Sequence, residues 1–97
     1  MPLARNEVLA DLTALREELA RRFSVRRIGL FGSLAHGDAT DTSDIDLLVE
    51  LAEPTYDHFM DLKFLLEERF GRRVDLVLAD DIKPRLKPVI EREVVYA

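Results

Sequence analysis

The composition of this 97-residue chain is typical of a globular protein with a single core. Hydrophobic residues make up 47% and charged residues 34%, which excludes a disordered chain, and the longest apolar run is far too short to cross a membrane. Fourteen basic residues against nineteen acidic ones give a net charge of −5. Neither a nucleic acid nor a membrane is therefore expected as a partner.

The chain contains no cysteine, which excludes disulfides and thiolate metal sites. Its first residues, MPLARNEV, lack the apolar core of a secretory signal, so the cytoplasm is the expected compartment. A bound nucleotide would need cations beside it, because an acidic protein attracts phosphate only through a metal ion or a local basic group.

A helix followed by a buried strand is predicted at the start of the chain. Apolar residues recur at intervals of three and four between Val8 and Phe23, as one buried helix face requires, and they predict a helix over residues 6–22. The segment 27–32 is short, apolar and closed by glycine, which indicates a buried strand. Residues 33–43 are rich in Gly, Ser, Thr and Asp and predict a loop or a short helical turn.

The alternation of strand and helix continues in the second half of the chain. Residues 44–51 predict a second strand, which Pro54 ends. A helix follows, with Thr55 placed to cap its start and Gly71 placed to close it. Residues 73–79 are again apolar and predict a third strand.

The tail beyond residue 81 predicts a short turn and then a final helix, because Pro88 lacks an amide and interrupts any helix begun at Pro84. These elements predict an α/β (α+β) fold, with a small mixed β-sheet flanked by helices in one domain over residues 1–97. Apolar residues that so small a sheet leaves uncovered favour a homo- or hetero-oligomer.

Two carboxylates stand at the start of the second predicted strand. Asp44 and Asp46 are two residues apart, so they point to one face of the strand while Ile45 and Leu47 point to the other. Like charges this close are tolerated when a divalent cation neutralises them. Mg²⁺ prefers such oxygen ligands and is usually completed by water and substrate phosphates, so the pair predicts a magnesium site.

Three further residues fit a phosphate and metal site. Gly32 lets the backbone approach a ligand closely, and the hydroxyl and amide of Ser33 can donate to a phosphate oxygen. Asp75 is a lone charge within an apolar strand, which a third metal carboxylate on a neighbouring strand would explain. An exposed sheet edge is the alternative explanation for Asp75.

One motif of the chain resembles the signature of the polymerase-beta-like nucleotidyltransferase superfamily. It consists of Gly32 and Ser33, ten further residues, and then Asp44-Ile45-Asp46 before an apolar run. Nearly the whole chain is similar to the minimal members of this superfamily, including the closing segment 81–87. The resemblance implies a nucleotidyltransferase fold, ATP as the nucleotide donor and Mg²⁺ as the cofactor. It implies a catalytic and metal-binding role for Asp44, Asp46 and Asp75, and nucleotide binding by Gly32, Ser33 and Ser43.

Many minimal members resemble antitoxins paired with a HEPN-domain ribonuclease, which they silence by attaching AMP to a tyrosine. The resemblance therefore implies metal-dependent transfer of AMP from ATP to the hydroxyl of a tyrosine on a HEPN toxin. A non-catalytic antitoxin that covers its toxin is the alternative. Transfer to a small molecule fits less well, because such relatives usually carry an additional domain for the acceptor.

Several polar residues fall outside this pattern. Many relatives carry arginine where this chain has His36, and both phosphate contact and loop packing remain open for this side chain. His58, near the start of a predicted helix, is expected at the surface. The pairs 26–27 and 72–73 are expected to be solvated arginines at strand starts.

Overall fold

Helices and strands alternate along the chain in the computed structural model, which describes residues 4–37 and 44–97. The elements are α1 (Arg5–Phe23), β1 (Val25–Phe31), α2 (Gly32–His36), β2 (Ile45–Leu51), α3 (Tyr56–Phe70), β3 (Val74–Leu78), the 3-10 helix η1 (Ala79–Asp81), α4 (Lys87–Glu93) and β4 (Val95–Tyr96). The predicted alternation of helices and strands is therefore confirmed.

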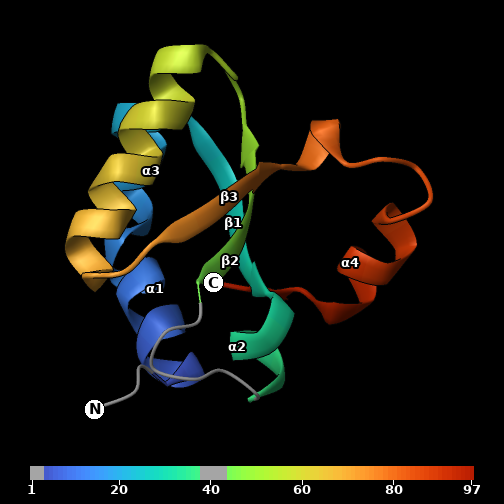
Figure 1. Ribbon diagram of the computed structural model, residues 1–97. Helices are drawn as coiled ribbons and strands as arrows, with labels where there is room; N and C mark the ends of the chain where they lie inside the picture. The colour runs from blue at the N-terminus through green and yellow to red at the C-terminus, as the bar shows by residue number, and fades with distance from the viewer. Residues whose placement is uncertain (1–3, 38–43) are drawn as a thin grey trace.

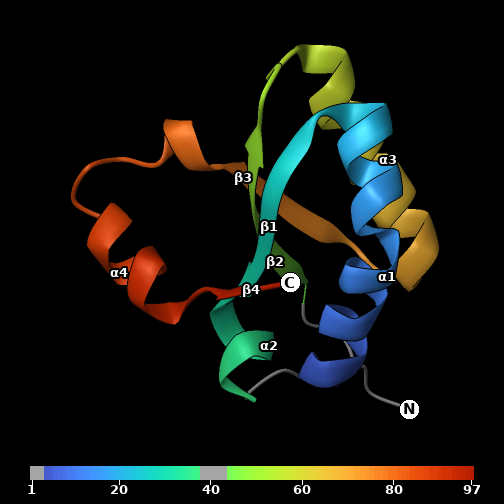
Figure 2. The same cartoon turned by 180° about the vertical axis from the view of Figure 1, so that it is seen from behind.

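The strands form one mixed sheet in the order β3-β2-β1-β4. β2 pairs antiparallel with β1 and parallel with β3, and β4 pairs antiparallel with β1. Helices α1 and α3 cover one face of this sheet, and α4 stands off on the opposite side (Figures 1 and 2). We call the side facing α4 the open face. No helix within residues 4–37 and 44–97 is long and apolar enough to span a bilayer.

The core lies between the sheet and helices α1 and α3. Every second residue of β2 enters it, because side chains alternate between the two faces of a strand. Burial of each aliphatic side chain contributes about 1.5–3 kcal/mol, so this layer is the main source of stability. Its fully buried members are Val8, Leu12, Leu19, Leu30, Ile45, Leu47, Val49, Leu62, Leu66 and Val74.

The predicted ends of α3 are confirmed. The Thr55 hydroxyl accepts a hydrogen bond of 3.1 Å from the His58 amide, which satisfies one of the free donors in the first turn. Gly71 ends the helix at φ 63°, a left-handed conformation that glycine adopts without strain. The proline-rich tail also follows the prediction, with a turn before α4 and Pro88 in the first turn of that helix.

Three strand predictions needed correction. β1 begins at Val25, two residues earlier than predicted, and it ends at Phe31 because Gly32 already belongs to α2. β2 begins one residue later than predicted and ends as predicted, and β3 is one residue shorter at each end. β4 was not predicted, since a strand of two residues carries too little pattern and depends on its pairing with Gly29 and Leu30 of β1.

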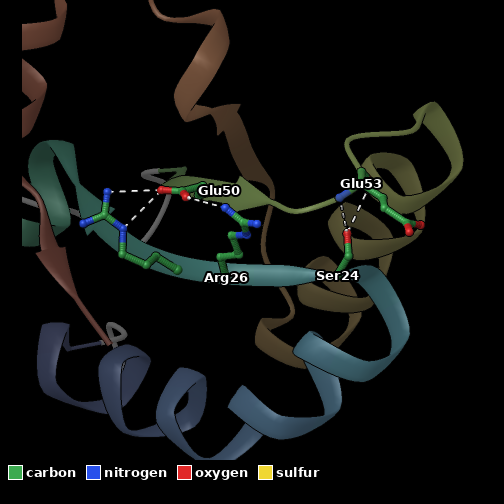
Figure 3. Close-up of polar contacts among 5 residues, drawn as sticks. Ser24, Arg26, Glu50 and Glu53 are labelled. Atoms are coloured by element: carbon green, nitrogen blue, oxygen red, sulfur yellow. Dashed lines mark hydrogen bonds and ion pairs between the residues drawn. The ribbon is translucent and has the colours of Figure 1, made fainter.

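Polar contacts tie the start of β1 to the end of β2 (Figure 3). Arg26 and Arg27 lie near the start of β1, and both pair with Glu50 of β2, at 3.8 Å and 3.2 Å. The Ser24 hydroxyl accepts a 3.0 Å hydrogen bond from the Glu53 amide. His58 lies at the surface in part, as a half-buried side chain with Nδ1 2.8 Å from the Glu53 carbonyl oxygen.

Candidate active site

Asp46 occupies the centre of the candidate site because of its position in β2. Its neighbours Ile45 and Leu47 are fully buried in the core. Asp46 therefore projects from the open face, and it is half-buried there. The register places it opposite Phe31 of β1 on one side and opposite Asp75 of β3 on the other. The sheet thus brings three separate segments of the chain together at this carboxylate.

Gly32 shapes the wall beside Asp46. Its φ of +76° is in the left-handed region, which side chains disfavour. A Cβ atom added to Gly32 would also overlap the Asp46 carboxylate. Glycine is therefore required here both for the turn from β1 into α2 and for the space that the carboxylate occupies.

Electrostatic repulsion is concentrated on Asp46. Burial raises the pKa of its carboxyl from 3.8 to about 6, and the negative charges of Asp75 and Asp44 add to this effect. A side-chain hydrogen bond with Asp75 also favours the protonated form. Asp44 and Asp75 are therefore close enough to Asp46 to raise the pKa of its carboxyl.

The two partner carboxylates are more exposed than Asp46. Asp44 lies immediately before β2 rather than within it, and Asp75 projects from β3, the outermost strand of the sheet. Asp75 therefore lies at an exposed edge and also beside Asp46, and its role as a metal carboxylate stays a prediction. Ser43, the remaining predicted nucleotide contact, lies outside the described residues.

The chemistry of this donor set suits a hard divalent cation. Carboxylate oxygens are the ligands that Mg²⁺ prefers, and a cation would relieve the repulsion that raises the pKa of Asp46. Within residues 4–37 and 44–97, no three acidic or histidine side chains are already closed around a common point. A preformed cage is not needed, because Mg²⁺ is commonly held by one or two carboxylates together with substrate phosphates.

Helix α2 carries the Gly32-Ser33 pair at its start, next to Asp46. Leu34 and Ala35 anchor this short helix in the core, and an Arg5 guanidinium donates to the Ala35 carbonyl at 3.3 Å. Ser33 is half-buried, and its hydroxyl makes no hydrogen bond to the rest of the described chain. The Arg5 contact had no sequence signature, because it joins residues thirty positions apart.

His36 lies at the other end of α2 from Gly32. Its Nε2 atom is 3.4 Å from a Glu93 carboxylate oxygen of α4, and the side chain is half exposed. The structure thus gives His36 a packing role between two helices. Contact of His36 with phosphate remains untested.

The sequence matches the family model for the nucleotidyltransferase domain over residues 12–97, which includes each of these site residues. The chain belongs to this family. It is a nucleotidyltransferase, and the resemblance seen in the Gly32-Ser33 and Asp44-Ile45-Asp46 segments is confirmed. The observed mixed sheet flanked by helices agrees with the fold that the resemblance implied.

Known relatives of this nucleotidyltransferase are of similar length. Protein adenylyltransferase MntA of Thermococcus cleftensis is 43% identical over 95 residues, which cover 97% of this chain and 96% of the relative. A solved structure proposed to be a minimal nucleotidyltransferase has a TM-score of 0.81 and 35% identity, covering 96% of this chain and 95% of that one.

A more distant likeness is to a solved complex of tri-AMPylated Shewanella oneidensis HEPN toxin with an MNT antitoxin. One of its chains matches this nucleotidyltransferase with a TM-score of 0.68 and 19% identity, covering 95% of this chain and 70% of that one. At this level of identity the likeness shows a shared fold.

Proposed function

We propose that this nucleotidyltransferase transfers AMP from ATP to a hydroxyl of a HEPN-domain toxin and thereby acts as its antitoxin. Support comes from the relative named protein adenylyltransferase MntA, which is similar over nearly the whole chain. The distant structural relative that occurs in a complex with an AMPylated HEPN toxin supports the same partner class. Tyrosine is the proposed acceptor.

The observation that carries the proposal is the cluster of Asp44, Asp46 and Asp75 beside Gly32. In the proposed site, Asp44 and Asp46 hold Mg²⁺ with the help of Asp75. The ion would neutralise negative charge on the triphosphate and on the departing pyrophosphate. Gly32 leaves the space that the Asp46 carboxylate occupies, and Ser33 offers a hydroxyl without a partner in the described chain. Ser43 is the third proposed nucleotide contact.

Asp75 would accept the proton of the attacking hydroxyl. A bond forms between the hydroxyl oxygen and the α-phosphorus of ATP, while the bond from this phosphorus to the bridging oxygen breaks and pyrophosphate leaves. Asp75 is suited to this step because it is exposed and adjoins Asp46. The proton is thus received on the side of the site that an acceptor can approach.

The test is to incubate the purified chain with ATP, MgCl₂ and the product of the adjacent gene as the candidate toxin, and then to measure intact masses. Mass gains of whole AMP units on the toxin are expected with the wild type and not with Asp44→Asn/Asp46→Asn. Asp61→Asn, an exposed position on α3, is the matched control and should keep full activity. An unmodified toxin in a stable complex would instead establish a non-catalytic antitoxin.

A further inference from the structure

The outer edge of β3 presents unpaired backbone groups beside Asp75. β3 is the outermost strand, and its pairing with β2 is fixed by the 3.0 Å hydrogen bond from the Ile45 amide to the Arg73 carbonyl. In a parallel ladder with this register, Asp75 and Val77 turn their backbone groups toward β2. The Leu76 amide and carbonyl and the Leu78 amide therefore point away from the sheet.

The first part of this edge is already closed. The Val74 amide donates to a Glu67 carboxylate oxygen of α3 at 2.9 Å. Across the described residues, no comparable contact engages the amide of Leu76 or of Leu78. The free edge therefore begins at Leu76 and runs toward η1. An edge of this kind is a template for pairing with another strand.

An apolar groove follows the same part of β3. It has a volume of about 450 Å³ and lies between the strand and the start of α3. Tyr56, which is 77% exposed, forms its outer wall and Phe59 contributes an apolar surface. A side chain entering the groove would remove much of this exposed aromatic surface from water. The full lining consists of Pro54, Thr55, Tyr56, Phe59, Leu76, Val77, Leu78 and Asp81.

The charged residues that line the groove, and those next to the lining on α3 and η1, are all acidic. Asp81 is the charged side chain of the lining. Asp57 follows Tyr56 and Asp80 precedes Asp81, and each of them is exposed. Asp75 adds a further carboxylate next to Leu76. An occupant with basic residues on either side of an apolar one would complement this surface.

We infer that the free edge of β3 binds the acceptor segment of the partner protein as an added strand. The inference rests on the proposed function for the identity of that partner. Residues of the added strand would alternate between the two faces of the sheet. An apolar residue opposite Leu76 would enter the groove, and the hydroxyl residue next to it in sequence would lie on the open face beside Asp75. The acceptor is therefore a hydroxyl residue with an apolar neighbour and basic residues nearby.

The decisive test removes one outward amide. Leu78 has φ −75°, which proline adopts, and its amide faces away from β2, so Leu78→Pro deletes the donor with little strain on the strand. Leu78→Ala is the matched control, since it shortens the side chain and keeps the amide. Affinity for the same candidate toxin, measured by calorimetry, should be about tenfold weaker for Leu78→Pro than for Leu78→Ala.

A second pair of variants tests the groove without touching the strand. Tyr56→Ser should weaken binding of the same toxin by about tenfold, because Tyr56 lines the groove. Phe64→Ser removes another aromatic side chain that is exposed on α3 but lies outside the groove, and it should bind as the wild type does. Each variant should bind ATP like the wild type, since none of these positions belongs to the aspartate cluster.

Equal affinities of Leu78→Pro and Leu78→Ala would overturn the inference, as would a wild-type chain that does not bind the toxin. Sedimentation of the chain alone gives a third outcome. If the wild type self-associates and Leu78→Pro does not, the edge joins two copies of this chain and the inference is also overturned. If the wild type binds the toxin in the expected manner but attaches no AMP, the proposed function fails while the strand edge stands as the binding surface.

Discussion

Replacing Asp46 by asparagine should make the metal-free protein more stable at neutral pH. In the folded chain the pKa of this carboxyl is raised from 3.8 to about 6, so between these values the native state keeps a proton that the unfolded state has lost. The free energy of unfolding therefore falls as the pH rises through this range. The whole loss of stability caused by ionised Asp46 is present above about pH 6. Asparagine removes the charge and retains a donor for Asp75.

The size of this effect follows from the pKa. The rise to about 6 corresponds to about 3 kcal/mol if it acts entirely on stability. Asp46 is only half-buried, and solvent screening reduces the expected gain to about 1 kcal/mol. For a chain of this length a gain of about 1 kcal/mol raises the melting temperature by about 4–8 °C.

Thermal unfolding in EDTA at pH 4 and at pH 7.5 measures both parts of this prediction. Asp46→Asn should melt above the wild type at pH 7.5, and the difference should nearly vanish at pH 4. Asp61→Asn on the exposed side of α3 is the control, and it should change stability by less than about 0.5 kcal/mol. Added MgCl₂ should stabilise the wild type more than Asp46→Asn. A variant that is no more stable at pH 7.5, or a gain that persists undiminished at pH 4, would refute the argument.

Other substitutions test separately the space around Gly32, its backbone strain and the cap of α3. Gly32→Ala should destabilise the fold more than Gly37→Ala in urea unfolding, because both have positive φ but only at Gly32 does a Cβ meet the Asp46 carboxylate. Equal losses would show that the carboxylate moves aside. Thr55→Ala should cost about 1 kcal/mol in the same assay through loss of the α3 cap, whereas Thr13→Ala, in an exposed part of α1, should cost clearly less. Similar costs for the two threonines would contradict the capping role.

Much of the fold could be predicted from local pattern. The three- and four-residue spacing of apolar side chains located α1, and Thr55 and Gly71 located the ends of α3. The failures arose where tertiary contacts decide the structure. Glycine at position 32 indicated the end of the strand, but the positive φ that ends β1 at Phe31 and makes Gly32 the first residue of α2 could not be read from the sequence. β4 exists because its two residues pair with β1, and Gly29 leaves room for them on the sheet.

In the candidate site, too, local pattern predicted some features and tertiary contacts decided others. The spacing of Asp44 and Asp46 already predicted a shared face, whereas the contact of Asp46 with Asp75 depends on the parallel pairing of β2 with β3. A strand order that separated these two strands would have left Asp75 as an isolated edge charge. Sequence alone offered both interpretations. The register places Asp75 at the sheet edge and beside Asp46, and its role as a metal ligand stays a prediction.

The order of the strands also divides the proposed reaction between this chain and its partner. Asp46 lies on an interior strand, with Gly32 at the end of β1 on one side and Asp75 on the other, so the groups proposed for ATP and Mg²⁺ come from this chain. Asp75 lies on the outermost strand, where backbone groups and an apolar groove remain uncovered. On the proposed function, the partner supplies the acceptor at this edge. The acceptor hydroxyl would then reach Asp75 from the uncovered side of β3, while ATP and Mg²⁺ lie on the open face beside Asp46.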